Sequence, residues 1–149
     1  MYILGLKNLG GPDSIEIKKA ESNKHDHKLL IVDDEPDVTL ALTKGLEENG
    51  FSVDAFRDPH LALEKFKPGL YDLLLLDVKM PTMNGFQLSQ EIKKKDPKAR
   101  VCFITAYEVF YDKLKDEYPK LDVGCFIKKP IETNDLVRKI KSELQHDKM

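Results

Sequence analysis

From Lys28 onward, the chain switches repeatedly between two hydrophobic patterns. Short apolar runs recur, and each is followed by a longer stretch in which apolar residues return every three or four positions. The short runs are typical of strands buried on both faces of a sheet, and the longer stretches are typical of amphipathic helices. The pattern predicts strands at 29–32, 51–56, 72–78, 101–104 and 123–127.

A helix signal follows each predicted strand. Pro36 suits the first turn of a helix, and Asn49-Gly50 is a plausible stop for it. Further helices are predicted after Asp58-Pro59, after Asn84-Gly85, around 109–115, and after Thr133. Five strands that alternate with five helices predict an α/β fold, in which helices cover both faces of a parallel sheet.

Residues 1–27 differ from the rest of the chain in composition and in hydrophobic pattern. They contain Gly10-Gly11-Pro12 and scattered charges, with no long apolar periodicity. Asp13 and Glu16 have the spacing of a capping box, which would start a short helix. We therefore divide the chain into a tail at 1–27, either flexible or a short helix, and a single domain at 28–146.

Composition narrows the class of protein. The chain has 149 residues, and 24 basic residues nearly balance 26 acidic ones, for a formal net charge of −2. This balance argues against nucleic acid as a main partner. No apolar run approaches the roughly 20 residues that span a bilayer, and no export signal opens the chain, so we expect a cytoplasmic protein with no membrane partner. Cys102 and Cys125 lack metal-site spacing, and two cysteines do not make a disulfide framework.

Polar residues gather where the predicted strands end. Ligands of open parallel sheets bind beyond the carboxyl ends of the strands, so a functional site is expected at these positions. The residues at these ends are Asp33, Asp34 and Glu35 after the first strand, Asp77 at the third, Thr105-Ala106 at the fourth, and Lys128-Lys129-Pro130 at the fifth. Singly, each has an ordinary use as a turn residue, a cap or a solvated side chain, and only their convergence on one edge favours a site.

The chemistry of this set favours phosphoryl transfer. Carboxylates held together repel by about 4 kcal/mol per pair at roughly 4 Å with an effective dielectric of ~20, so they either raise a pKa or hold a cation. Oxygen ligands of this kind suit Mg²⁺. A lysine and a threonine hydroxyl would complete a phosphoryl-binding set. Neither glycine-rich nucleotide loop occurs, which leaves a carboxylate as the phosphoryl acceptor.

Four stretches together resemble the response-regulator receiver domain of two-component signalling, in its stand-alone, chemotaxis-regulator-like form. They are Ile31-Val32-Asp33-Asp34-Glu35-Pro36, Leu76-Asp77-Val78-Lys79-Met80-Pro81-Thr82-Met83-Asn84-Gly85, Thr105-Ala106 and Lys129-Pro130. The similarity covers about residues 28–146. It implies a five-stranded, flavodoxin-like, doubly wound (βα)5 fold with strand order 2-1-3-4-5.

The resemblance implies a role for each acidic residue. Asp77 would be the phosphorylated nucleophile. Asp34 would bind Mg²⁺ directly, and Asp33 would act chiefly through a water on the metal. The backbone carbonyl of Lys79 would complete the metal's protein ligands.

The resemblance also assigns the remaining site residues. Thr105 would bond the phosphoryl group through its hydroxyl and move on activation, and Phe126 would be the aromatic that turns inward with it. Lys129 would pair with the phosphoryl oxygens. Lys128 is the rival, but strand alternation points it away if Lys129 points in. The family usually has a cis peptide before this proline, so Lys129–Pro130 is expected to be cis.

These roles predict a phosphorylation-activated receiver rather than an enzyme, with only self-catalysed phosphotransfer and autodephosphorylation. It would accept phosphate on Asp77 from a sensor histidine kinase or a histidine phosphotransfer protein, and then switch a surface that binds a downstream effector. The first helix, with Leu40 and Leu42, would be the kinase-docking face. We expect a monomer or a weak dimer.

Two alternatives remain open. One is an aspartyl-nucleophile phosphatase or phosphotransferase, although such enzymes usually carry a second Asp where Lys79 stands. The other is a receiver fragment of a longer regulator or hybrid kinase; only about 20 residues follow Lys129, enough for the last helix and no output domain.

Two further hypotheses concern the side chains beside the expected pocket and the segment before the fifth strand. Lys79 and Tyr107 would overhang the phosphoryl pocket and slow the loss of phosphate, or they would be solvated side chains. The long segment between Thr105 and Phe126 predicts a displaced or irregular fourth helix with aromatic residues at its surface.

Overall fold

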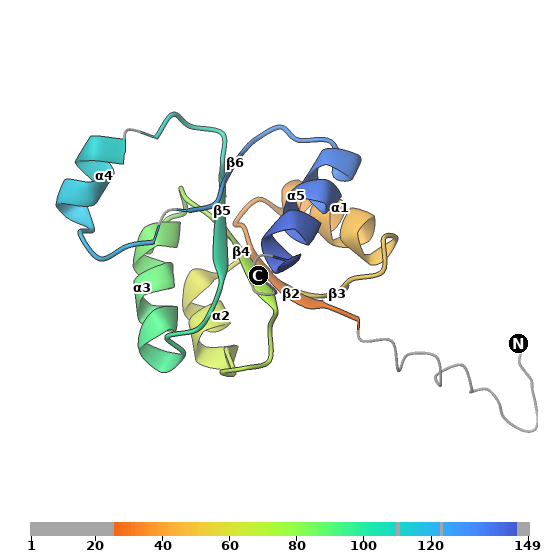
Figure 1. Ribbon diagram of the computed structural model, residues 1–149, viewed down its shortest axis with the longest axis horizontal. Coiled ribbons are helices and arrows are strands. Elements are labelled where there is room, and N and C mark those ends of the chain that lie inside the picture. Colours follow the sequence, from red (N-terminus) through yellow and green to blue (C-terminus); the bar gives the residue numbers. More distant parts are fainter. Residues whose placement is uncertain (1–25, 110, 123, 146–149) are drawn as a thin grey trace, which may run out of the picture.

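Five strands and five helices alternate along the chain in a computed structural model that describes residues 26–109, 111–122 and 124–145 (Figure 1). The strands are β2 (Lys28–Val32), β3 (Ser52–Phe56), β4 (Leu73–Asp77), β5 (Val101–Thr105) and β6 (Phe126–Lys128). The helices are α1 (Pro36–Glu47), α2 (Pro59–Lys65), α3 (Gly85–Lys95), α4 (Tyr111–Glu117) and α5 (Thr133–Gln145).

The strands form one parallel sheet in the order β3-β2-β4-β5-β6. In chain order this is 2-1-3-4-5, so the predicted fold class and strand order are confirmed. Helices α1 and α5 cover one face of the sheet, and α2 and α3 cover the other (Figure 1). Helix α4 lies at the periphery beside α3.

The sheet separates two apolar cores because alternate side chains of each strand point to opposite faces. On β2, Leu29 and Ile31 belong to the core under α1 and α5, whereas Leu30 and Val32 belong to the core under α2 and α3. Strand β4 is buried along its whole length. The continuous apolar runs of the sequence therefore mark strands covered on both sides.

The edge strand β6 differs most from its prediction. The apolar pattern predicts a strand over 123–127, but β6 begins at Phe126, and position 123 lies outside the described residues. The side-chain Oδ1 of Asp122 accepts a hydrogen bond from the Gly124 amide at 3.1 Å, just before the strand. Helix α4 begins at Tyr111 and ends at Glu117, slightly later than the predicted 109–115.

A disulfide joins Cys102 of β5 to Cys125, immediately before β6, with a Cα–Cα distance of 4.7 Å. Their spacing along the chain does not predict this bond, because the two residues are 23 apart in sequence. Parallel pairing of β5 with β6, which places Phe103 opposite Phe126, brings the residue before each of them together. The sequence therefore does not predict this single disulfide.

The predicted tail at 1–27 lies outside the described residues except for Asp26 and His27, so the domain boundary at 27/28 stays a prediction. Among the helices within 26–145 that the structure describes, none combines the length and the apolar character needed to cross a bilayer.

Candidate functional site

The carboxyl edge of the sheet gathers the side chains that the sequence singles out. Asp33 and Asp34 follow β2, and Asp77 and Thr105 are the last residues of β4 and β5. Lys129 follows β6 directly. Because all five strands are parallel, these positions meet at one end of the molecule.

Asp33 is the most firmly held residue of the site. It is fully buried, and its Oδ1 accepts a hydrogen bond from the Glu35 amide at 3.0 Å. Its Oδ2 lies 2.7 Å from the Nζ of Lys129. The Thr39 hydroxyl donates to the backbone oxygen of Asp33 at 2.8 Å, which ties the start of α1 to the same loop. Contacts on several sides therefore hold this carboxylate in one orientation.

Asp77 is buried beside other carboxylates, and its pKa reflects this. Only 4% of the residue is exposed. Burial, followed by the charge of Asp33, raises the pKa of Asp77 from 3.8 to about 7, and Asp34 adds to the rise. Lys129, whose Nζ lies 3.3 Å from Oδ1 of Asp77, lowers this pKa only in part. The site therefore carries more negative charge than one lysine neutralises.

Lys129 is the cation of this cluster. Burial lowers the pKa of Lys129, but its hydrogen bond to Asp33 and the charges of Asp33 and Asp77 outweigh burial and raise it overall. Lys128 is exposed and lies in another pocket, so the structure directs Lys129 rather than Lys128 toward the carboxylates. The Lys129–Pro130 peptide is cis, which confirms that prediction.

The acidic cluster fits a hard divalent cation. One carboxylate oxygen from each of Asp33, Asp34 and Asp77 lies within 4.8 Å of the others. Three carboxylates and one ammonium leave an excess of negative charge in a mostly buried position, and oxygen-only donors of this kind suit Mg²⁺. The raised pKa of Asp77 is the electrostatic sign of that excess.

The loop after β4 fixes the backbone of Asp77. The Gly85 amide donates to the Val78 carbonyl at 2.9 Å, and a Cβ on Gly85 would lie 2.3 Å from the backbone oxygen of Asp77. Asn84 and Gln87 form a reciprocal capping box at the start of α3. The sequence indicates Asn84-Gly85 only as a helix start. The close approach of this glycine to the end of β4 is a tertiary contact, which only the folded chain reveals.

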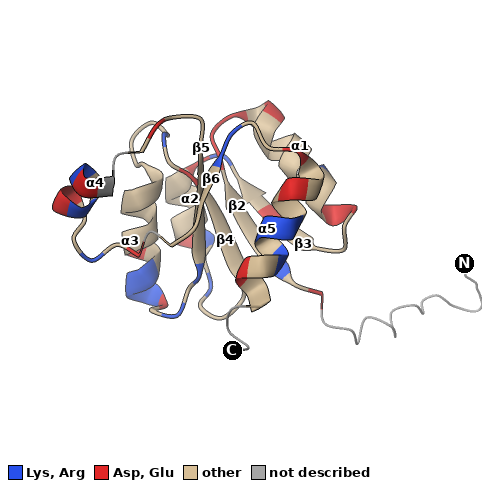
Figure 2. Cartoon of the chain, turned by 45° about the horizontal axis from the view of Figure 1, so that its top comes forward, with Lys and Arg blue, Asp and Glu red and all other residues tan. Residues whose placement is uncertain are grey.

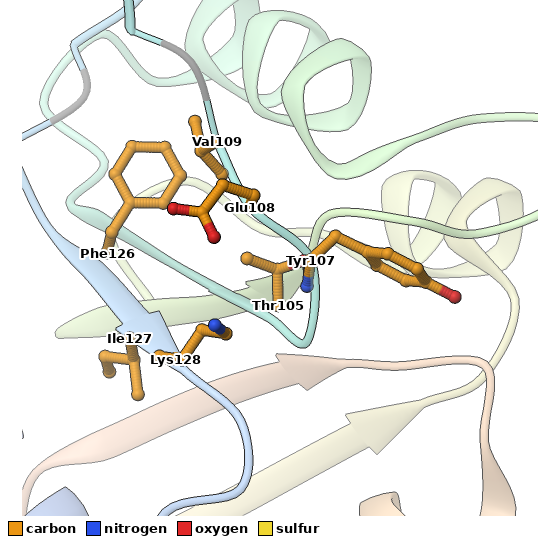
Figure 3. Close-up of a pocket in the computed structure, with 7 residues that line it drawn as sticks. All are labelled: Thr105, Tyr107, Glu108, Val109, Phe126, Ile127 and Lys128. Carbon is orange, nitrogen blue, oxygen red and sulfur yellow. Dashed lines mark hydrogen bonds between the residues drawn. The ribbon is translucent and has the colours of Figure 1, made fainter.

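Thr105 lies beside the acidic cluster with its hydroxyl already engaged. The residue is 3% exposed, and its Oγ1 accepts a hydrogen bond from the Tyr107 amide at 3.0 Å. Its backbone oxygen accepts from the Lys129 amide at 2.8 Å, so β5 and the loop after β6 are joined here. A pocket of about 200 Å³ extends from Thr105 to Phe126, and Figure 3 shows these residues facing one another with Glu108.

Phe126 is half-buried on the α3 side of the sheet. Its ring centroid lies 5.4 Å from that of Phe103 and 6.1 Å from that of Phe86. Tyr118, after α4, also contacts Phe86, at 5.5 Å. The predicted switch aromatic therefore belongs to a ring cluster that links β6 to α3 and to the end of α4.

Lys79 and Tyr107 meet above the site. The Lys79 Nζ lies 4.7 Å from the centroid of the Tyr107 ring, which is within range of a cation–π contact. Tyr107 is 57% exposed, and its ring is directed away from Phe126 (Figure 3). The loop after β4 and the loop after β5 are thus bridged by this contact.

Two relatives are similar in sequence to about three quarters of this chain. Over 116 residues, the chain is 34% identical to the transcriptional regulatory protein DltR of Streptococcus agalactiae, covering 76% of this chain and 50% of DltR. It is 37% identical over 113 residues to the aerobic respiration control sensor protein ArcB of Escherichia coli, covering 76% of this chain and 14% of ArcB. The chain therefore spans half the length of the first relative and a small part of the second.

A solved structure has the same fold. The response regulator protein TrrA of Thermotoga maritima, determined in complex with Mg²⁺ and BeF, superposes with a TM-score of 0.67 at 31% identity. The match covers 78% of this chain and 98% of TrrA. A family model described as the response regulator receiver domain matches residues 29–141, which include every residue of the acidic cluster and Lys129. The chain thus belongs to the response regulator receiver domain family.

Proposed function

We propose that Asp77 of this signalling receiver accepts a phosphoryl group from a phosphohistidine of a sensor kinase or a histidine phosphotransfer protein, in a Mg²⁺-dependent reaction. The observation that supports this proposal best is the position of Lys129, whose Nζ lies between a buried carboxylate of Asp33 and the acceptor oxygen of Asp77. A cation at this distance from the nucleophile lies where the negative charge of an incoming phosphoryl group has to be neutralised.

The reaction needs little covalent chemistry from the protein beyond the attack by Asp77. An ionised Asp77 oxygen attacks phosphorus, the phosphorus–nitrogen bond of the donor breaks, and the donor imidazole keeps the electron pair and takes up a proton. Bound Mg²⁺, held by Asp33, Asp34, Asp77 and the backbone carbonyl of Lys79, would supply positive charge for the acidic side chains and the phosphoryl oxygens. Lys129 would then pair with a phosphoryl oxygen of the acyl phosphate.

Thr105 is placed to detect the new group. Because its Oγ1 accepts a hydrogen bond from the Tyr107 amide, its own hydroxyl proton remains available for a phosphoryl oxygen. Movement of Thr105 would alter the pocket it shares with Phe126, and so the ring cluster around Phe86. We propose this region, between α4 and β6, as the surface that binds a downstream effector.

A groove next to the acidic cluster is our candidate for docking of the phosphodonor protein. Its volume is about 470 Å³, and it is lined by Asp37, Val38, Ala41, Leu42, Ile104, Ala106, Lys129, Pro130 and Ile131. Leu40 of α1 is 70% exposed nearby in sequence. A largely apolar groove bordered by the proposed phosphoryl-pairing lysine suits a helix that delivers a phosphohistidine to Asp77.

An enzyme of the aspartyl phosphatase type is less well supported. Such an enzyme needs an acid/base group close to the nucleophile. Lys79 stands at that position, and its Nζ lies against the Tyr107 ring rather than in hydrogen-bonding contact with Asp77. We therefore propose a phosphoacceptor, in a cytoplasmic setting, with no catalytic turnover of other substrates.

Intact mass spectrometry after incubation with acetyl phosphate and Mg²⁺ tests the proposal. The wild-type chain should gain the mass of one phosphoryl group, and Asp77→Asn should gain none. Asp112→Asn, on the exposed surface of α4, is the matched control and should be phosphorylated like wild type. Absence of the added mass on wild type, or its presence on Asp77→Asn, would contradict the proposed acceptor.

A further inference from the structure

The disulfide between Cys102 and Cys125 lies at the end of β5 opposite the acidic cluster. Cys102 is fully buried and Cys125 is 3% exposed. Both belong to the core under α1 and α5, together with Ile104 and Ile127. Cys102 is the second residue of β5 and Thr105 is its last, so the two features are separated along one strand.

A pocket of about 420 Å³ leads to this bond from the amino-terminal edge of β5. It is lined by Lys93, Pro97, Lys98, Ala99, Arg100, Val101, Asp122, Gly124, Cys125 and Glu143. Cys125 lines the pocket and Cys102 does not. A molecule bound in the pocket would therefore lie next to Cys125 rather than Cys102.

The charges around the pocket are mixed, with a basic excess. Three cationic side chains, Lys93, Lys98 and Arg100, line it together with two carboxylates, Asp122 and Glu143. Figure 2 shows basic residues gathered at the carboxyl end of α3, and one of them, Lys93, lines the pocket. This combination suits a small zwitterionic molecule that carries more carboxylate than ammonium groups.

We propose that Cys102–Cys125 is a reversible thiol–disulfide exchange site for a small, carboxylate-bearing thiol of the glutathione class. In reduction, the thiolate attacks Sγ of Cys125, the Cys102–Cys125 bond breaks, and Cys102 leaves and takes up a proton. A second thiolate attacks the outer sulfur of the mixed disulfide and releases Cys125. In total, the protein disulfide and two thiols give the protein dithiol and one small-molecule disulfide.

Exchange at this position would change the edge strand β6. Strand β6 has three residues and pairs only with β5 in the sheet order, so the covalent bond adds a second link to β5 at its start. In the dithiol form, the hydrogen bond from the Phe103 amide to the Cys125 carbonyl and apolar packing remain. The amides of 125–129 should therefore exchange hydrogen faster in the reduced protein.

Two single-cysteine variants of the full chain test the assignment of the reactive sulfur. With oxidised glutathione, Cys102→Ala should form a mixed disulfide at Cys125, whereas Cys125→Ala should stay unmodified at the buried Cys102. Intact mass measures both. Equal modification of the two variants, or none of either, would overturn the proposal.

A second measurement uses the protein with both cysteines, so that it does not depend on how the variants fold. Across glutathione buffers of increasing oxidation, wild type should lose the mass of two hydrogen atoms in one reversible step, and the amides of 125–129 should become slower to exchange. Two outcomes would contradict the proposed exchange site. One is a chain that stays oxidised or reduced in every buffer, and the other is equal hydrogen-exchange rates of the amides of 125–129 in the two forms.

The role of the basic pocket is tested separately. Lys98→Glu should slow reduction by glutathione about threefold more than it slows reduction by 2-mercaptoethanol, because both attack as thiolates but only glutathione also carries carboxylates. Lys113→Glu on α4 is the control and should react like wild type. Equal rates for Lys98→Glu and wild type with glutathione would rule out recognition by this pocket. None of these readouts involves phosphorylation, so they fail or succeed independently of the proposed function.

Discussion

The Nζ atom of Lys129 lies 2.7 Å from Oδ2 of Asp33, a carboxylate with no exposed surface. The lysine that is proposed to pair with the phosphoryl oxygens therefore already contacts a buried carboxylate, although the two residues are 96 apart in sequence. This ion pair fixes the direction of the side chain before any ligand binds. It also means that a change at Lys129 affects both folding and phosphorylation.

Lys129→Ala should slow phosphorylation by acetyl phosphate at least about tenfold, since one preorganised positive charge near the acceptor is lost. It should also lower the free energy of unfolding in the absence of Mg²⁺ by about 3 kcal/mol, because Asp33 loses its buried counter-charge. Intact mass and urea unfolding measure the two effects. Lys128→Ala, which removes an exposed lysine, should change neither.

Asp77 should make the metal-free protein sensitive to pH. Because the pKa of Asp77 is raised to about 7 in the folded protein, the folded chain binds this proton more tightly than the unfolded chain, whose carboxyl has a pKa near 3.8. The stabilising contribution is complete below pH ~4 and is lost as the pH rises through about 7. Asp77→Asn should therefore raise the free energy of unfolding at pH 8 by on the order of 1–3 kcal/mol, and change it little at pH 4.

Mg²⁺ should reverse this loss in wild type. The cation offsets the carboxylate charges, so its stabilisation should be larger at pH 8 than at pH 5, where protons compete for Asp77. Asp34→Asn should weaken the stabilisation by Mg²⁺. Thermal unfolding with Mg²⁺ or with a chelator measures this effect, and equal stabilisation at both pH values would contradict the electrostatic description of the site.

Gly85→Ala should destabilise the domain by about 1–3 kcal/mol and reduce phosphorylation of Asp77. Its new Cβ would lie 2.3 Å from the backbone oxygen of Asp77, so either α3 or the end of β4 must shift. Gly124→Ala is a milder comparison, since its Cβ meets only the side-chain Oδ1 of Asp122 at 3.3 Å. Similar losses of stability in both variants would show that the close approach at Gly85 is not the cause.

Lys79→Ala and Tyr107→Ala should each speed the loss of phosphate from Asp77 by about two- to fivefold, as expected for an exposed cation–π contact of ~0.5–1 kcal/mol. The double variant should decay no faster than either single one, because the two residues act through one contact. Decay is followed by intact mass after removal of acetyl phosphate, with Lys113→Ala as a control. Unchanged decay in both single variants would leave this contact without a kinetic role.

The sequence predicts the fold well where its signals are local. Continuous apolar runs identify β2 and β4 because both strands are covered on two faces, and the parallel order then brings Asp33 and Asp77 to one edge. The start of β6 is harder to predict, because this strand pairs with a single neighbour at the edge of the sheet. The Cys102–Cys125 bond and the contact of Gly85 with Asp77 depend on tertiary neighbours, which no local pattern encodes.

The two apolar cores have a consequence for how signals are received and passed on. The groove proposed for the phosphodonor borders Leu42 and Ile131, which pack on the core under α1 and α5, whereas Phe126 packs on the core under α2 and α3. The groove proposed for the phosphodonor and the surface proposed for the effector thus lie on opposite faces of the sheet. Asp77 and Thr105, at the carboxyl edge of the same sheet, would connect the two. A phosphodonor bound on one face would leave the other face open, so donor and effector would not need to compete for the same surface.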